Sequence, residues 1–113
     1  MFSPPPALLV AWTTVSSRDD AEKLASAVVV QNLAACVQID GPIASHYRWQ
    51  GQAERTEEFR LCFKFLPAQL ASLEIFIRDH HPYDTPEWIV VPATAVGEKY
   101  LSWATANSST PPL

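Results

Sequence analysis

The strongest pattern of hydrophobic and polar positions in this chain covers residues 58–65, where the two kinds of side chain alternate. A period of two residues is typical of a β-strand that buries one face and exposes the other. The two predicted faces are Phe59, Leu61, Phe63 and Phe65 on the buried side and Glu58, Arg60, Cys62 and Lys64 on the other. The continuous apolar run 7–12 instead predicts a strand that is covered on both faces and is therefore central in its sheet.

Two other segments have apolar residues at helical spacing. The first helix is predicted to follow an N-cap at Ser16 or Ser17 and to continue to Asn32. The second is predicted to open at Pro67 and to end before residues 80–82, because proline is tolerated in the first turn of a helix but not in its interior. The two apolar stripes are Ala21, Leu24, Ala25, Val28 and Val29 in the first helix and Leu66, Leu70, Leu73 and Ile77 in the second.

A β-hairpin is predicted between the helices. Residues 33–39 form a buried apolar run that stops at 40–42, and residues 43–50 resume an extended pattern that places Ser45, Tyr47 and Trp49 on one face. Gly51-Gln52 is a weak turn signal before the alternating strand.

A short strand at 88–91 and a short helix after Gly97 complete the order of elements. Strand, helix, two strands, helix and strand form the ferredoxin-like βαββαβ arrangement of the α+β class, an antiparallel sheet with two helices on one face, here followed by a short C-terminal helix. We expect a single domain over 7–106, a flexible leader at 1–6 and a disordered tail at 107–113.

This arrangement leaves the second face of the sheet without cover, so another subunit is expected to supply it. Residues 34–50 as one strand would reach ~55 Å at ~3.3 Å per residue, against a domain diameter of about 35 Å for a chain of this length. Either Gly41-Pro42 bends the strand, or the hairpin around Tyr47 and Trp49 projects and packs on a neighbouring chain. An isolated two-stranded ribbon is only marginally stable, which favours the neighbour.

Composition excludes some partners. The 113 residues carry a formal net charge of −4, and the basic residues are interrupted by acidic ones, so no nucleic acid partner is expected. The apolar run 7–12 is too short for a signal core or a membrane span, so we expect a cytoplasmic protein with reduced thiols and no membrane partner. Cys36 and Cys62 are not expected to pair, because the predicted hairpin sets Cys62 opposite Gly41, five residues or roughly 17 Å away.

The run His80-His81-Pro82-Tyr83-Asp84-Thr85-Pro86-Glu87 holds the candidate metal ligands. His80, His81 and Glu87 offer two imidazoles and a carboxylate, and imidazole suits copper and zinc. Adjacent histidines point in different directions. The expected geometry is therefore one histidine per chain, either repeated around a threefold axis or joined by an acidic residue of a neighbour. The alternatives are that His81 caps the helix before Pro82 and that Glu87 is simply an acidic residue at a strand start. Any copper site is expected to be weak and unnecessary for folding.

A ligand cleft is the second candidate site. Lys64 beside Trp49 or Tyr83 would form a cationic, aromatic-walled pocket for a small anion, and the alternative is an interfacial ion pair. Glu58 and Lys64 are six residues apart, ~20 Å along one strand face, so they are not expected to pair directly.

The chain contains no catalytic motif, since it has only three glycines and none of the common nucleophile or metalloprotease signatures. We therefore do not expect an enzyme. A small hydrolase or transferase remains an alternative only if a site between subunits joins Cys36, His81 and Glu58 as nucleophile, base and orienting group.

Five blocks of residues, in this order, resemble the signature of the CutA divalent-cation-tolerance proteins. They cover nearly all of the predicted domain, and the chain departs from the usual pattern at Gln38, where the family has Asn, and at Phe65, where it has Thr. The blocks are Leu33-Ala34-Ala35-Cys36-Val37, then Ser45, Tyr47, Trp49 and Gly51, then Glu58 and Lys64, then His81-Pro82-Tyr83 with Pro86-Glu87, then Gly97, Tyr100, Leu101 and Trp103.

The resemblance implies a homotrimer of ferredoxin-like protomers in a PII-like assembly, associated with tolerance to copper and other divalent metals and without established catalysis. It favours direct metal binding as the function. A PII-like regulatory module that binds a small anion or a partner protein between subunits is the alternative. The cleft residues carried by these blocks are Cys36, Tyr47, Trp49, Glu58, Lys64 and Tyr83.

Overall fold

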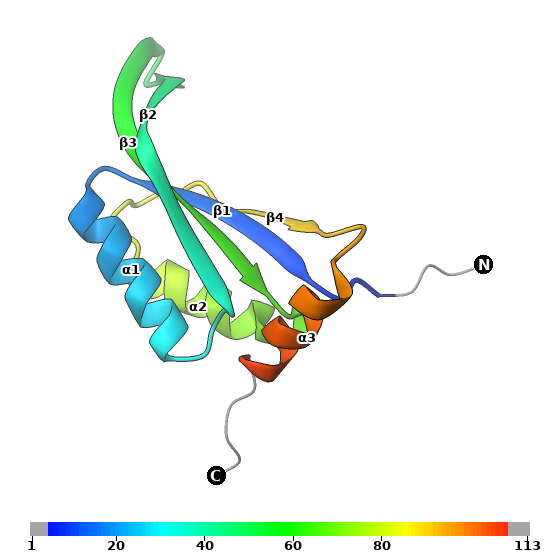
Figure 1. Ribbon diagram of the computed structural model, residues 1–113. Coiled ribbons are helices and arrows are strands. Elements are labelled where there is room, and N and C mark those ends of the chain that lie inside the picture. The colour runs from blue at the N-terminus through cyan, green and yellow to red at the C-terminus, as the bar shows by residue number, and fades with distance from the viewer. Residues whose placement is uncertain (1–4, 109–113) are drawn as a thin grey trace.

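Strand β1 (Leu9–Val15) lies at the centre of a four-stranded antiparallel sheet in the computed structural model, which describes residues 5–108 (Figure 1). The strand order is β2-β3-β1-β4, with β2 at Cys36–Trp49, β3 at Gln52–Phe65 and β4 at Ile89–Pro92. The central position predicted for the first apolar run is confirmed. Within residues 5–108 the fold is α+β, with three α-helices beside the open antiparallel sheet.

Helices α1 (Arg18–Val30) and α2 (Leu70–His80) cover one face of the sheet (Figure 1). The alternation predicted for β3 is confirmed at Leu61, Phe63 and Phe65, which are fully buried beneath these helices. At the start of the predicted pattern it is weaker, because Phe59 is only partly buried and Glu58 is buried. The opposite face of the sheet has no such helical layer, so Arg60, Cys62 and Lys64 of β3 remain at least partly accessible. This helix-free face carries the candidate site.

The first helix begins and ends as its sequence indicates. Ser17 is the N-cap, and its hydroxyl accepts a hydrogen bond of 3.1 Å from the backbone N–H of Asp20. The helix ends before Asn32, which adopts a left-handed conformation with φ of 58°. One predicted core position was wrong, because Val29 is 42% exposed whereas Val28 is fully buried.

Strand β2 differs most from its prediction. It is one strand from Cys36 to Trp49 rather than two, and a bulge between Asp40 and Ile43 replaces the predicted break. The strand also begins at Cys36 rather than Leu33, because residues 33–35 connect it to α1.

Two glycines shape this hairpin. Gly41 has φ of 148°, and a Cβ there would lie 2.8 Å from Phe59 Cδ1 and 2.9 Å from the Glu58 carbonyl oxygen, so no other residue fits without displacement. The tight turn is Gln50-Gly51, with positive φ at both residues, and not Gly51-Gln52 as predicted. The bulge and this turn together set the register of the hairpin.

The distal half of the hairpin projects beyond the sheet (Figure 1). All residues from 46 to 57 are exposed in the single chain. Both expectations for the overlong ribbon therefore hold in part: the strand is irregular at Gly41-Pro42, and the hairpin extends away from the body.

At the other end of the sheet, a 3-10 turn at Pro67–Gln69 opens α2, and α3 (Glu98–Ala106) follows Gly97. Ser108 is buried, so the packed chain extends two residues past the predicted boundary at Ala106. The remainder of the predicted tail and residues 1–4 of the predicted leader lie outside the described residues. Within residues 5–108, no helix is long and apolar enough to cross a membrane.

Candidate functional site

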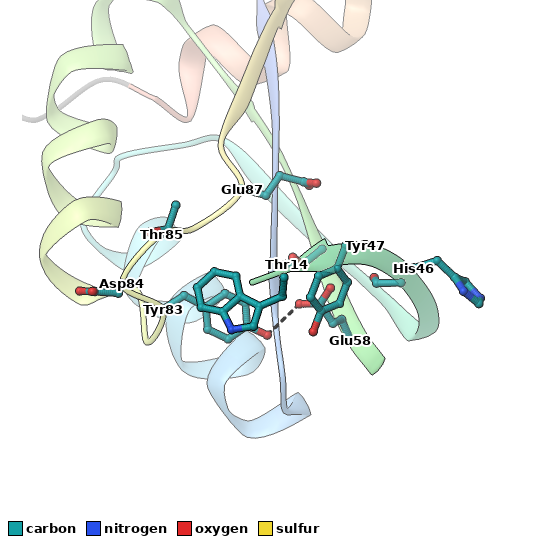
Figure 2. Close-up of a pocket in the computed structure, with 10 residues that line it drawn as sticks. Thr14, His46, Tyr47, Glu58, Tyr83, Asp84, Thr85 and Glu87 are labelled. Carbon is teal, nitrogen blue, oxygen red and sulfur yellow. Dashed lines mark hydrogen bonds between the residues drawn. The ribbon is translucent and has the colours of Figure 1, made fainter. Parts of the chain in front are cut away.

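A cleft of about 680 Å³ lies on the helix-free face, between the β2–β3 hairpin and the loop that follows α2 (Figure 2). Four of the six residues predicted for a cleft meet here, namely Tyr47, Trp49, Glu58 and Tyr83. The other lining residues are Thr14, Ser45, His46, Asp84, Thr85 and Glu87.

Tyr83 and Glu58 form the central polar contact of this cleft. The Tyr83 hydroxyl donates a hydrogen bond of 2.7 Å to Glu58 Oε2, and Figure 2 shows the two side chains pointing at one another. Glu58 is only 9% exposed, although it occupies the face of β3 that has no helical cover. Burial, followed by the hydrogen bond to Glu58, raises the pKa of Tyr83, so this residue remains a hydroxyl donor.

His81 holds the loop against β1. Its Nδ1 accepts a hydrogen bond of 3.0 Å from the backbone N–H of Tyr83, which requires Nδ1 to be unprotonated. Its Nε2–H then donates to Thr13 Oγ1 at 2.9 Å, and that hydroxyl donates to the carbonyl oxygen of Glu87 at 2.7 Å. Burial lowers the pKa of His81, which favours the same neutral form. Because both ring nitrogens are engaged, His81 acts as a structural residue of the loop.

His80 is in a different position. Its Nδ1–H donates to the carbonyl oxygen of Phe76 at 3.0 Å, and its ring stacks on Phe76 with centroids 4.0 Å apart. This contact orients the exposed ring, and a ring N–H donated to a backbone carbonyl is commonly seen in metal-binding histidines.

The single chain does not assemble a closed metal site. Among residues 5–108, no three His, Cys, Asp or Glu side chains are grouped closely enough to hold an ion, so His80, His81 and Glu87 do not form a ligand set. Figure 2 shows His46 and Asp84 pointing away from the Tyr83–Glu58 contact. A site at this cleft would need ligands from outside the chain.

Cys36 and Lys64 lie at the opposite end of the same sheet face. Cys36 pairs with Lys64 across β2 and β3, whereas Glu58 pairs with Ile43, six residues or ~20 Å further along β3. The ammonium of Lys64 donates to the side-chain oxygen of Gln38. Within one chain, Lys64 therefore does not meet Trp49 or Tyr83, and a cationic pocket formed with aromatic residues of another chain stays a prediction. One chain does not bring Cys36 close to Glu58 either, because this separation is too large for hydrogen bonding, and the predicted arrangement with His81 between subunits stays untested.

Both cysteines are free thiols, as predicted, but the predicted register was wrong. Cys62 pairs with Gln38 and not with Gly41, so it is offset from Cys36 by two residues instead of five. The shifted turn and the bulge in β2 account for the difference.

The charge of the cleft is negative. In the described part of the chain, its charged lining residues are the carboxylates Glu58, Asp84 and Glu87, and no lysine or arginine lines it. Arg60, on the same strand as Glu58, is bound to Asp40 at 2.9 Å, and this hydrogen bond raises the pKa of Arg60. The cleft therefore favours a cation over an anion.

The sequence interpretation missed Thr13 and Thr14. Thr13 is fully buried and accepts the His81 hydrogen bond, and Thr14 lines the cleft. Two adjacent polar residues in a central strand were the available signal, because buried hydroxyls require hydrogen-bond partners.

Comparisons with known proteins agree with this architecture. The family model for the CutA1 divalent ion tolerance protein matches residues 9–107. The chain is 38% identical to "Protein CutA, chloroplastic" of Arabidopsis thaliana over 84% of this chain and 52% of that protein. It is 36% identical to the "Divalent-cation tolerance protein CutA" of Yersinia pestis over 88% of this chain and 83% of that protein. The chain thus spans about half the length of the Arabidopsis relative.

A solved structure extends the similarity to three dimensions. CutA from Synechococcus elongatus PCC7942 superposes with a TM-score of 0.89 at 39% sequence identity, covering 93% of each chain. The name of the Arabidopsis relative places that protein in the chloroplast, so the cytoplasmic location expected for this chain stays a prediction.

Proposed function

This chain belongs to the CutA1 divalent ion tolerance protein family, and from this premise we propose that it acts in divalent-cation tolerance by binding copper or a similar divalent metal ion. The proposed active form is a homotrimer of ferredoxin-like protomers in a PII-like assembly. The metal is bound in the acidic cleft between the hairpin and the loop after α2, where a neighbouring chain completes the ligand set.

The acidic lining of the cleft carries this proposal. Glu58, Asp84 and Glu87 are its charged residues within the described chain, and the cation of Arg60 is already paired with Asp40. Carboxylates attract divalent ions electrostatically, and their oxygens together with imidazole nitrogen form common ligand sets for such ions. The family name states the same class of ion.

Assembly is needed because the ligands of one chain diverge. Trp49 and Tyr47 line the cleft and are respectively 57% and 43% exposed on the projecting hairpin. Large exposed aromatic side chains on one element favour packing on a partner. A neighbour seated there would bring its own side chains to the cleft.

His80 is an exposed imidazole whose Nε2 can ligate, whereas His81 uses both nitrogens. It is exposed at the C-terminal end of α2 and separated from Glu87 along the chain by the loop. We propose His80 as a second contributor to copper binding, and the His80→Ala variant below separates it from the cleft.

The alternative functions have less support. A regulatory site for a small anion would need a cation in the cleft, whereas Lys64 lies near the other end of β3. A hydrolase or transferase would need the thiol of Cys36 near a free histidine, and the nitrogens of His81 are occupied.

Calorimetric titration of tag-free protein with copper(II) and zinc(II) at about pH 7.5 tests the proposal. An Asp84→Asn/Glu87→Gln variant should lose most of the copper affinity, while Glu22→Gln, an exposed control on α1, should retain it. Equal affinity in the cleft variant and the parent would refute the cleft site. Loss confined to His80→Ala would move the site to the imidazole, and a parent that binds neither ion would refute direct metal binding.

A further inference from the structure

Cys36 and Cys62 lie close together on the helix-free face of the sheet, at the end remote from the acidic cleft. Cys36 pairs with Lys64 and Gln38 pairs with Cys62 in the β2–β3 register. Residues directly opposite one another share a face, as do residues two apart on one strand. The two thiols are therefore diagonal neighbours on adjacent strands, and both are free and half-buried.

The spacing of this pair suits a bridging ion better than a disulfide. Diagonal neighbours in an antiparallel pair have Cα atoms about 7–8 Å apart, with the Cβ atoms somewhat closer. A disulfide requires about 4.4–6.8 Å between Cα atoms. Metal–thiolate bonds are about 2.3 Å long, so one ion can bridge two sulfur atoms separated by roughly twice that distance.

Gln38 lies directly opposite Cys62, and Tyr100 and Lys64 also lie beside the thiols. Tyr100 projects from α3, which packs beside the end of the sheet where β2 begins (Figure 1). Burial raises the pKa of Tyr100, and Cys36 and then Cys62 raise it further, so the phenol lies near both sulfur atoms. Lys64 lies directly opposite Cys36 and two residues from Cys62 on β3, which brings a positive charge to the pair.

We propose that Cys36 and Cys62 bind one copper(I) ion in two-coordinate, digonal geometry. Thiolates are soft ligands that select copper(I). Zinc prefers four ligands, and this cluster offers only two of the required type. Binding releases the two thiol protons and forms two copper–sulfur bonds without a change in oxidation state. The resulting complex carries one negative charge, which the ammonium of Lys64 offsets.

This site is separate from the proposed divalent site. Cys36 and Glu58 are separated by about six residue positions along the hairpin register, ~20 Å. The oxidation state and the ligand class of the bound metal differ as well. The two proposals can therefore fail independently.

Anaerobic competition with a chromogenic copper(I) chelator tests the site on the full chain. The parent should withdraw one copper(I) per chain. Loss of a group that hydrogen-bonds to a metal ligand typically weakens metal binding by roughly 10–100-fold. Cys36→Ala and Cys62→Ala each remove a ligand itself, so each should weaken copper(I) binding by more than this. Glu87→Gln, in the acidic cleft, should bind copper(I) like the parent, which separates this site from the divalent one.

A second measurement uses the unaltered chain and does not depend on the folding of any variant. Copper(I) should protect both thiols from alkylation, as read by mass spectrometry of the peptides, and X-ray absorption should show two sulfur neighbours. Protection of one cysteine alone, a nitrogen or oxygen ligand set, or parent-like affinity in either cysteine variant would overturn the proposal. Failure of the parent to withdraw copper(I) from the chelator would also overturn it.

Discussion

The hydroxyl of Tyr83 lies 2.7 Å from Oε2 of Glu58, and this contact joins the loop after α2 to strand β3. It places a buried carboxylate at the centre of an otherwise open cleft. The loop that carries Tyr83 is itself held by His81, whose ring binds the Tyr83 backbone on one side and Thr13 on the other. The cleft is thus shaped by a hydrogen-bonded loop that is anchored to the central strand.

Tyr83→Phe should destabilise the folded chain. The substitution leaves Glu58, which is 9% exposed, without its hydroxyl donor. Loss of a hydrogen bond to a buried charged group costs about 1.5–3 kcal/mol, which urea unfolding at neutral pH would measure. Tyr47→Phe is the matched control, because its hydroxyl accepts an exposed hydrogen bond of 3.4 Å from Thr56 rather than binding a buried carboxylate. Equal losses in the two variants would show that the Glu58 contact adds no stability.

Acidification should weaken the fold through His81. Burial lowers the pKa of His81 below its ordinary value of 6.5, so the unfolded chain binds this proton at a higher pH than the folded chain does. The free energy of unfolding therefore decreases as the pH falls through about 6.5 and below. Comparing urea unfolding at about pH 7.5 and about pH 5.5 measures the decrease.

A His81→Gln variant should lose less stability between these two pH values than the parent, because glutamine does not titrate. His46→Gln is the matched substitution at a histidine that is exposed on the hairpin, and it separates the effect of His81 from the effect of removing a histidine elsewhere. An identical pH dependence in the parent and in His81→Gln would contradict the role given to His81.

The elements with strong periodicity were predictable from the sequence. The alternation that buries Leu61, Phe63 and Phe65 reflects the transfer of one strand face from water into the core. This pattern is local, so it can be recognised without knowing which strands or helices pack against β3. The N-cap at Ser17 is local in the same way. The continuity of β2 was not predictable, because Gly41-Pro42 has the composition of a strand break and forms a bulge here.

The site was less predictable than the fold. Tyr47, Trp49, Glu58 and Tyr83 meet in one cleft, but Cys36 and Lys64 do not join them, because the hairpin register separates the two groups along β3. The contact of His81 with Thr13 joins residues 68 positions apart. Such a contact depends on how the loop after α2 packs on β1, which no short sequence pattern determines.

Gly41→Ala should destabilise the bulge in β2. The new methyl group would lie 2.8 Å from Phe59 Cδ1 and 2.9 Å from the Glu58 carbonyl oxygen, and the φ of 148° disfavours alanine. Overpacking of this kind costs about 1–3 kcal/mol. Gly97→Ala is the control, because a Cβ there would meet only Tyr100 Cβ, at 4.0 Å. Thermal unfolding should show a lower midpoint for Gly41→Ala than for Gly97→Ala, and the reverse order would contradict the close approach.

Trp49→Ala should weaken both assembly and thermal stability. Trp49 is 57% exposed in the single chain, so truncation would cost little if the hairpin stayed in solvent. If the indole packs on a neighbouring chain, as the proposed trimer requires, its removal should cost about 3–5 kcal/mol per site. Ile75→Ala on α2 is the control, since Ile75 is 51% exposed on an element outside the hairpin.

Light scattering at micromolar concentration should give about three times the chain mass of 12.5 kDa for the parent and for Ile75→Ala, and a smaller mass for Trp49→Ala. The concentration dependence of thermal unfolding provides an independent check, because the midpoint of an associating protein rises with concentration whereas that of a monomer does not. A parent mass of 12.5 kDa with a concentration-independent midpoint would exclude the trimer and leave the acidic cleft without the neighbouring ligands that the proposed divalent site needs.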